Sequence, residues 1–185
     1  MTTYTQPEPT RNIALQQALS TSTERLLKVI GLFSEEQATA KPEPNAWTVV
    51  EVLEHIFLTE HIVFNILRTA PTQAGKVAAG TSPQTIDTLT KILQNRQKLV
   101  VAPETVSPKG RFSSLKEITE AILKKRQTIQ QQLQEADLAD DVEFPHPFFG
   151  NMNKKQWVDF MLLHTERHCQ QMEILANHTT NTEQL

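Results

Sequence analysis

The chain has 185 residues, a formal net charge of −3 at pH 7 and a single cysteine, Cys169, which excludes an intrachain disulfide. This length suits one domain, over residues 1–185, that can bury a core without covalent staples. The charge balance lacks the basic surplus typical of nucleic-acid binders, and no stretch approaches the ~20 apolar residues of a membrane span, so we expect neither kind of partner.

The first helix is predicted from about Arg11 to Phe33, because its apolar residues recur at spacings of three and four. Ser34 is then predicted to open a short turn. Pro42 and Pro44 stop any helix before the second segment begins.

The second helix is predicted from Thr48 to about Thr69. Thr48 and Glu51 have the spacing of a capping box, in which each side chain accepts the backbone N–H of the other residue. The helix is apolar over a wide arc, and we therefore expect it to be buried on more than one side. The apolar residues are Val49, Val52, Leu53, Ile56, Ile62, Val63, Ile66 and Leu67.

A long connection with four prolines follows, over residues 70–112, and an amphipathic piece near residues 85–99 predicts a short accessory helix inside it. The third long helix is predicted to begin at Ser114, with Glu117 completing a second capping box. Arg126 falls on the apolar stripe of this helix.

The fourth long helix is predicted from after Asn153 to about Asn177, and no strand-like alternation is sustained anywhere in the chain. Four amphipathic helices of roughly 20 residues predict an all-α four-helix bundle. The long connection lets the second and third helices run parallel, which predicts an up-down-down-up arrangement. We expect residues 1–10 and 179–185 to form flexible tails.

The fourth helix carries the motif H-T-E-R-H, from His164 to His168. Residues four apart lie about 40° apart around a helix and ~6 Å along it, so both imidazoles can bind one metal ion. The pair shares its stripe with Trp157 and Phe160, which predicts that it points inwards. The alternative is two histidines at the core margin that hydrogen-bond to neighbours. Thr165 after the first histidine excludes the zinc-metalloprotease arrangement.

His55 lies on an apolar face of the second helix. A histidine in such a place loses solvation unless it has a partner. Three inward histidines from two helices favour a metal site formed by His55, His164 and His168 over separate buried histidines. Three imidazoles leave a coordination position open, which is typical of catalytic sites rather than structural ones.

Other polar residues are weaker candidates. Gln171 lies near the face of the site and is a candidate contact to water or substrate. Arg126 is a candidate contact to an anionic substrate group, although such an arginine more often extends its charge to solvent. Glu51 either caps its helix or orients the free nitrogen of His55. Cys169 is expected to pack as a small apolar residue.

Three further histidines are weaker candidates, and only His146 is kept as a less favoured alternative, as a fourth ligand or a substrate contact. His61 is turned away from the face of His55, His178 is near the tail, and His146 is expected in a loop with a structural hydrogen bond. Glu166 projects away from the two histidines that flank it, and we expect it to form a surface pair within its helix.

Two blocks of sequence resemble the DinB/YfiT-like metalloenzyme superfamily, in particular its DinB-like domain proteins. The block P-E-P-N-A-W-T-V-V-E-V-L-E-H, from Pro42 to His55, is similar to the start of their second helix. The block H-P-F-F-G-N-M-N-K-K-Q-W-V-D-F-M-L-L-H-T-E-R-H-C-Q-Q, from His146 to Gln171, is similar to their last helix and the loop before it. The resemblance covers nearly the whole chain.

The resemblance implies a four-helix bundle, often homodimeric, with a divalent metal, zinc or nickel, at His55, His164 and His168. Characterised members of that superfamily include S-transferases and isomerases that use low-molecular-weight thiols, which implies a small-molecule substrate. No residue of this chain selects one particular thiol.

Two functions therefore stay open. The first is a metal-dependent enzyme, such as a thiol-dependent transferase or a related hydrolase. The second is a non-catalytic protein, metal-binding or stress-linked, that acts through interactions. The single cysteine and an N-terminus without the pattern of a signal peptide favour a cytoplasmic location for either.

Overall fold

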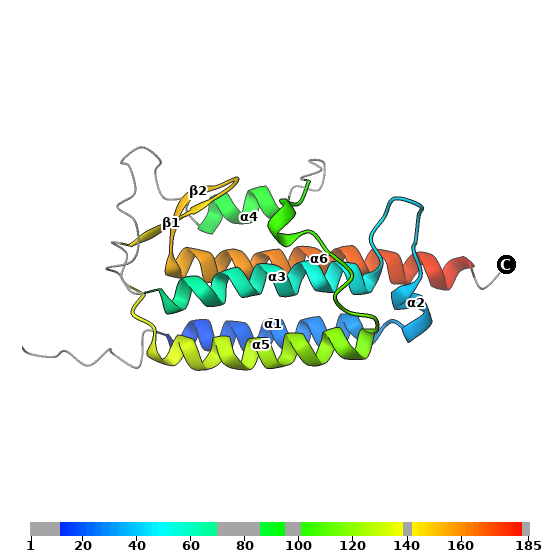
Figure 1. Ribbon diagram of the computed structural model, residues 1–185, viewed down its shortest axis with the longest axis horizontal. Coiled ribbons are helices and arrows are strands. Elements are labelled where there is room, and N and C mark those ends of the chain that lie inside the picture. The colour runs from blue at the N-terminus through cyan, green and yellow to red at the C-terminus, as the bar shows by residue number, and fades with distance from the viewer. Residues whose placement is uncertain (1–11, 70–85, 95–100, 139–141, 183–185) are drawn as a thin grey trace, which may run out of the picture.

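The computed structural model describes residues 12–69, 86–94, 101–138 and 142–182. Four long helices lie side by side along the molecule (Figure 1), which confirms the predicted bundle. They are α1 (Ile13–Ile30), α3 (Val49–Arg68), α5 (Leu115–Glu135) and α6 (Lys154–Thr182). Most of the predicted tails, residues 1–10 and 183–185, lies outside the described residues. Residues 179–182, by contrast, continue α6.

The colour gradient in Figure 1 shows α1 and α6 running in one direction and α3 and α5 in the other. This is the predicted up-down-down-up arrangement. Both α1 and α3 contact α5 and α6, so α1 and α3 occupy opposite corners of the bundle. Among the described residues, no helix combines the length and apolar character that crossing a membrane requires.

The start of α3 shows the predicted capping box. The hydroxyl of Thr48 accepts the backbone N–H of Glu51 at 3.1 Å, and the carboxylate of Glu51 accepts the N–H of Thr48 at 2.8 Å. Glu51 also pairs with Lys41 at 3.1 Å. Of the two roles predicted for Glu51, the structure therefore shows that of a helix cap. These contacts fix the N-terminal end of α3, which leads to His55.

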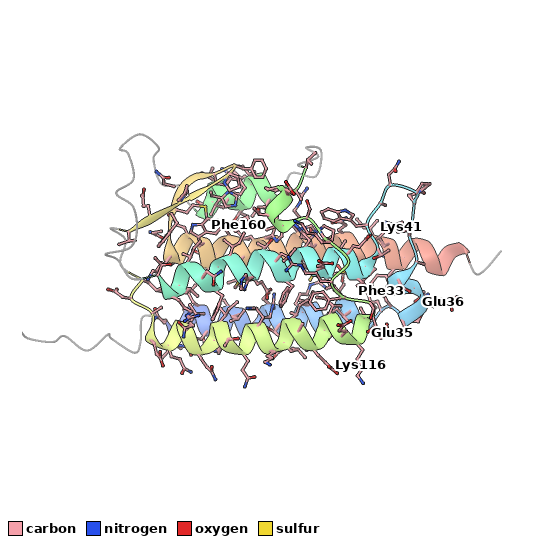
Figure 2. All side chains as sticks on the ribbon, in the orientation of Figure 1. Phe33, Glu35, Glu36, Lys41, Lys116 and Phe160 are labelled. Atoms are coloured by element: carbon pink, nitrogen blue, oxygen red, sulfur yellow. The ribbon has the colours of Figure 1, made fainter. Side chains whose placement is uncertain are left out.

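The turn predicted after Ser34 is a short helix, α2 (Glu35–Thr39), for which Ser34 is the N-cap. The carboxylate of Glu35 accepts the backbone N–H groups of Leu115 and Lys116 at 2.7 and 2.9 Å, at the start of α5 (Figure 2). The second predicted capping box is half formed. The hydroxyl of Ser114 accepts from the N–H of Glu117, whereas the Glu117 carboxylate accepts from Ser113.

A two-stranded antiparallel hairpin, β1 (Glu143–His146) and β2 (Gly150–Asn153), precedes α6 and is absent from the sequence-based prediction. His146 pairs with Gly150 at the end of β1, so the expectation of a loop position for His146 is wrong. Gly150 has φ of 72°, a conformation that favours glycine. Strands of four residues are too short to display a sustained alternation.

The predicted accessory helix is present as α4 (Ile86–Gln94), which packs against α6. The remainder of the predicted range, up to residue 99, lies outside the described residues. A 3₁₀ helix, η2 (Glu104–Val106), follows and contacts α3. The described part of the connection that leads from η2 to the start of α5 crosses α3 (Figure 1).

The core consists of two apolar clusters. The first includes Leu19, Val63, Ile129 and Met161, and the second includes Leu26, Ile56, Ile122 and Met172. Each long helix contributes to both clusters. A polar layer lies between them. It consists of the buried residues Glu60, Arg126 and Thr165 and the half-buried Ser22, one from each long helix, at positions between the two clusters.

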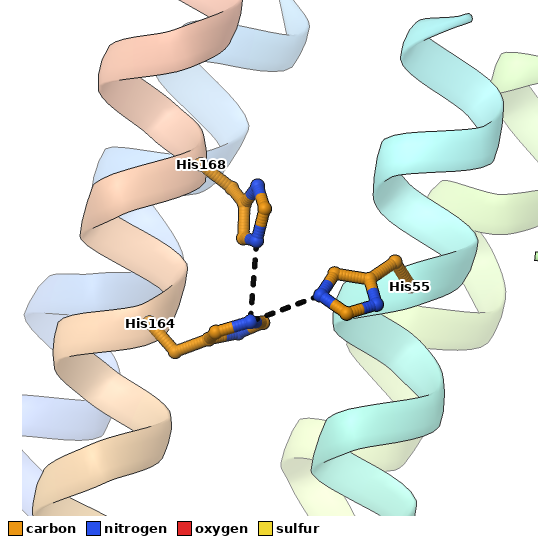
Figure 3. A group of neighbouring side chains, drawn as sticks. All are labelled: His55, His164 and His168. Carbon is orange, nitrogen blue, oxygen red and sulfur yellow. Dashed lines mark hydrogen bonds between the residues drawn. The ribbon is translucent and has the colours of Figure 1, made fainter. Parts of the chain in front are cut away.

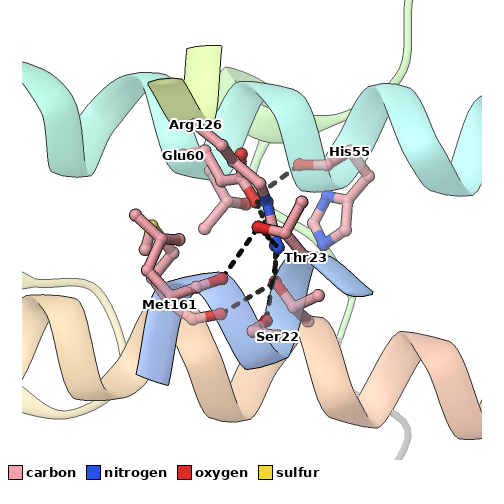
Figure 4. A network of polar contacts seen from close by, with 9 residues as sticks. Ser22, Thr23, His55, Glu60, Arg126 and Met161 are labelled. Carbon is pink, nitrogen blue, oxygen red and sulfur yellow. Dashed lines mark hydrogen bonds and ion pairs between the residues drawn. The ribbon is translucent and has the colours of Figure 1, made fainter. Parts of the chain in front are cut away.

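Arg126 is the centre of this polar layer and is only 3% exposed. Its guanidinium donates to the Glu60 carboxylate at 2.9 and 2.7 Å and to the hydroxyls of Ser22, Thr23 and Thr165 (Figure 4). The expectation that Arg126 extends its charge to solvent is wrong, because all five N–H groups of a guanidinium find partners inside the bundle. A contact to substrate stays a prediction that this geometry does not favour.

Because these clusters fill the bundle without any metal, we expect the fold to survive metal removal. Chelation should lower the thermal midpoint while leaving the helical circular dichroism signal in place. The measurement is a thermal scan of the protein with and without a chelator. A collapse to a random-coil spectrum after chelation would contradict this account of the core.

Candidate metal centre

Three histidines from two neighbouring helices meet beside the polar layer. His55 comes from the middle of α3, and His164 and His168 come from successive turns of α6 (Figure 3). The Nε2 atom of His164 lies 3.0 Å from Nε2 of His55 and 3.2 Å from Nε2 of His168. One possible ligand atom from each residue lies within 4.8 Å of the others. The three residues predicted as ligands thus converge through the same ring nitrogen.

The outer nitrogens of two of these rings have carbonyl partners. Nδ1 of His55 lies 2.8 Å from the backbone oxygen of Val106, and Nδ1 of His168 lies 2.9 Å from Oε1 of Gln171. A carbonyl oxygen can only accept, so each Nδ1 carries the proton and each neutral ring presents a lone pair at Nε2. Metal-binding histidines are commonly oriented in this way.

The converging lone pairs fit a cation better than a set of hydrogen bonds. With His55 and His168 unprotonated at Nε2, the ring of His164 can supply at most one proton to two acceptors. A cation satisfies all three lone pairs together. Two imidazole nitrogens that bind zinc at ~2.0–2.1 Å in a tetrahedral arrangement lie about 3.3 Å apart, close to the separations seen here.

Burial lowers the pKa of all three histidines. That of His168 falls to about 3, through burial and then repulsion from His55. That of His164 falls well below its ordinary value for the same reason, with further repulsion from His168. The pKa of His55 is also lowered by burial, and its hydrogen bond to Val106 partly offsets the effect. The rings are therefore neutral at pH 7, the form that binds a metal ion.

The sequence profile of the DinB superfamily matches residues 18–172, a range that includes all three histidines. The chain belongs to the DinB superfamily. It is 25% identical over 143 residues to the uncharacterized protein YuaE of Bacillus subtilis (strain 168), across 76% of this chain and 83% of YuaE. The crystal structure of TT2238, a four-helix bundle protein, superposes with a TM-score of 0.55 at 18% identity, over 87% of this chain and 97% of that chain. This likeness shows the shared fold.

Aromatic rings enclose the histidines of this DinB-superfamily chain on two sides. The ring centroid of Trp47 lies 5.2 Å from that of His55, and the ring of Phe160 lies 5.4 Å from that of His164. Trp47 is half-buried and precedes α3, whereas Phe160 is buried one turn before His164 on α6. The histidines are thus placed between two apolar walls that limit the approach of water.

His146 belongs to the aromatic wall and not to the histidine cluster. Its ring packs against Phe149, Trp157 and Phe160, with centroids 4.5, 4.8 and 4.6 Å away. Its Nδ1 accepts the backbone N–H of Phe148 at 3.1 Å, which is the structural hydrogen bond expected from the sequence. Burial lowers the pKa of His146 to about 4.

Three further polar or titratable residues of α6 were considered from the sequence, and only one of them contacts the histidine cluster. Gln171 is at the site, where its carboxamide holds His168. Cys169 is buried in the second apolar cluster, and burial raises the pKa of its thiol to about 11. Glu166 accepts from the side chain of Gln170 within α6 at 3.1 Å, which confirms the expected pair within its helix. It also pairs with Arg25 of α1 at 3.2 Å, a contact that was not predicted.

His61 is exposed and lies 3.0 Å from Nζ of Lys125, away from the cluster. Two residues that shape the site are missing from the sequence-based prediction. Val106 contributes a backbone carbonyl from the long connection, which no side-chain pattern can indicate. Glu54, next to His55, accepts three backbone N–H groups of the same connection.

The lowered pKa values predict how the metal-free protein responds to acid. The unfolded chain binds protons at its histidines below about pH 6.5, whereas the folded protein keeps His146, His164 and His168 neutral to lower pH. The free energy of unfolding should therefore fall as the pH drops below about 6.5, by up to ~1.4 kcal/mol per pH unit for each such histidine.

Urea unfolding at pH 7.5, 6.5 and 5.5 measures this dependence, and replacing His146 with phenylalanine should make it shallower. A free energy of unfolding that is constant over this range would show that the three histidines are not held neutral by the fold.

Proposed function

We propose that this protein is a divalent-metal-dependent enzyme whose ion is held by His55, His164 and His168. The observation that carries the proposal is the convergence of three neutral imidazoles through Nε2. Within the described part of the chain, no cysteine or carboxylate joins this group as a fourth ligand. Three histidine ligands with an open position are typical of catalytic zinc sites.

Zinc or nickel is the proposed ion, because imidazole nitrogens suit both. All three ligands are neutral, and the positive charge of Arg167 contributes, after burial and the other two histidines, to the lowered pKa of His164. The ligands therefore leave the charge of a divalent ion uncompensated, which favours an anionic group at the open position.

The reaction we propose is transfer to or from a low-molecular-weight thiol, with hydrolysis of a small molecule as a related possibility. A divalent ion at this site would lower the pKa of a coordinating thiol enough for the thiolate to form near neutral pH. Val106 and Gln171 hold the rings of His55 and His168 in one tautomer, and Trp47 and Phe160 provide the apolar walls. A cytoplasmic homodimer is part of the same proposal.

One observation favours a non-catalytic, metal-binding alternative. The three residues are only 6, 9 and 8% exposed, for His55, His164 and His168 in that order, which restricts access of a substrate. Substrate entry would then depend on movement of the aromatic walls. Thiol binding distinguishes the two functions, because a closed site admits no external ligand.

The test uses protein purified without a histidine tag and loaded with cobalt as a spectroscopic substitute. Addition of 2-mercaptoethanol or free cysteine should produce a new sulfur-to-cobalt absorption band, whereas the matched alcohols should not. The band should be absent in His168→Ala. No band with any thiol, together with no metal-dependent transfer to a generic electrophile, would reject the enzyme in favour of the non-catalytic alternative.

Cys169 should not be the nucleophile of this reaction. Its thiol is buried among apolar side chains and its pKa is raised to about 11, so it is protonated at neutral pH. We expect Cys169→Ala to bind metal and thiols as the wild type does, and native Cys169 to resist alkylation until the protein is unfolded. Rapid alkylation of the folded protein would contradict this placement of the thiol.

A further inference from the structure

Glu54 is buried on α3, immediately before His55, and its carboxylate points at the connection that crosses α3. Its oxygens accept the backbone N–H groups of Lys109, Gly110 and Arg111 at 2.9, 3.0 and 3.2 Å. The residue is 0% exposed. A carboxylate is costly to bury without partners, and three N–H groups in succession supply them.

The backbone of the connection is shaped to hold a carboxylate. Gly110 has φ of 69°, in the left-handed region, while a side chain built there would meet no other atom within 4 Å. Successive N–H groups around such a residue form a concave anion-binding nest. In this chain the anion in the nest is the side chain of Glu54. The glycine is thus required by its backbone conformation and not by lack of space.

The same connection supplies the acceptor that orients His55. The backbone oxygen of Val106, three residues before Lys109, lies 2.8 Å from Nδ1 of His55. Two adjacent residues of α3 therefore bind one segment, Glu54 through residues 109–111 and His55 through Val106. A ring contact between Phe57 and Phe112, with centroids 5.3 Å apart, is a further tie between α3 and this part of the connection.

We infer that Glu54 is a positioning residue for the metal site. By anchoring residues 109–111, its carboxylate holds the Val106 carbonyl against Nδ1 of His55. This contact keeps the proton of the ring on Nδ1, so that Nε2 presents its lone pair towards His164. The inference rests on the proposed metal site, but the tautomer of His55 can be measured without metal.

The test compares Glu54→Gln with Glu104→Gln. Glu104 lies on the same connection with its side chain 93% exposed. Its carboxylate lies 4.0 Å from Nζ of Lys109, so its variant removes the same charge and this exposed side-chain pair but none of the backbone hydrogen bonds of the nest. In Glu54→Gln, the carboxamide nitrogen cannot accept, and the nest loses part of its hydrogen bonding. Amide exchange at residues 109–111 should become faster, and the dissociation constant for zinc should rise ~10–100-fold, as for other residues that orient metal ligands. Glu104→Gln should change neither.

Gly110→Ala should weaken the same contact between Glu54 and residues 109–111. It strains the backbone of the nest while leaving the Glu54 side chain in place. It should weaken zinc binding in the same direction, and the double variant should be little worse than Glu54→Gln, because both changes release one contact. Circular dichroism of each variant establishes that the bundle is folded.

Nitrogen-15 NMR of the metal-free protein reads the tautomer of His55 directly. Wild type should show a proton on Nδ1, and Glu54→Gln should show a mixture of tautomers. Wild type that keeps this tautomer but binds no zinc would reject the proposed function and leave the positioning role intact. Unchanged tautomer and unchanged zinc affinity in Glu54→Gln, with faster exchange at residues 109–111, would overturn the positioning role.

Discussion

Replacing His164 with alanine should abolish stoichiometric metal binding. His164 is the middle ring of the cluster, with its Nε2 at 3.0 and 3.2 Å from the Nε2 atoms of His55 and His168. Its removal leaves only two of the three ligands, His55 on α3 and His168 on α6. The binding free energy of a site with three ligands depends on all of them, so loss of the central one should leave only weak binding. Competition with a chromogenic chelator measures the affinity.

His61→Ala is the matched control, since it removes an exposed histidine from α3 and should leave the affinity unchanged. His146→Ala is a second control, which tests whether the ring in the aromatic wall takes part in binding. Full metal content in His164→Ala would show that the ion is bound elsewhere.

The second large effect concerns stability. Replacing Arg126 with methionine should destabilise the bundle by about 3–5 kcal/mol, because it leaves the buried carboxylate of Glu60 without its partner. The two side chains are only 2 and 1% exposed, and burial already raises the pKa of Glu60. Without Arg126 the pKa of Glu60 should rise further. Protonation then relieves the unpaired charge, so the defect should become smaller as the pH is lowered. Urea unfolding at pH 7 and pH 5 measures both.

The control is Arg25→Met, which breaks two partly exposed ion pairs between α1 and α6, to Glu166 and Glu173. The Arg25 side chain is 29% exposed, and each pair of this kind contributes about 0–1 kcal/mol, so the variant should cost less than Arg126→Met. Replacing Glu60 and Arg126 together by methionine should restore most of the stability, since apolar packing can substitute for a buried pair. A cost below ~1 kcal/mol for Arg126→Met alone would contradict the central place of Arg126 in the bundle.

The fold was predictable where long helices carry their own signals. Thr48 and Glu51 mark the start of α3, and the apolar periodicity of the four long helices is sufficient for the bundle. Short elements were not predictable in this way. The five residues of α2 form little more than one turn, and each strand of the hairpin has four residues. Such lengths are too short for a period to be recognised.

In the candidate site, too, only part of the arrangement was predictable from the sequence. The three histidines were predictable because spacing and apolar surroundings place them on inward faces. The partners of those residues were not, since they depend on the tertiary structure. Val106 acts through its backbone carbonyl, which no side-chain pattern indicates. The sequence around Glu54 does not indicate its partners, because they come from the connection that packs against α3. Glu60 lies within an apolar helix, and only the position of Arg126 on α5 explains its burial.

The most direct test of the three-histidine site is a crystal structure of the tag-free protein loaded with one equivalent of zinc, with data collected at the zinc absorption edge. We expect a single anomalous peak per chain, ~2.0–2.1 Å from Nε2 of His55, His164 and His168. A peak at His61 or His146, or no ordered zinc at the three histidines, would contradict it.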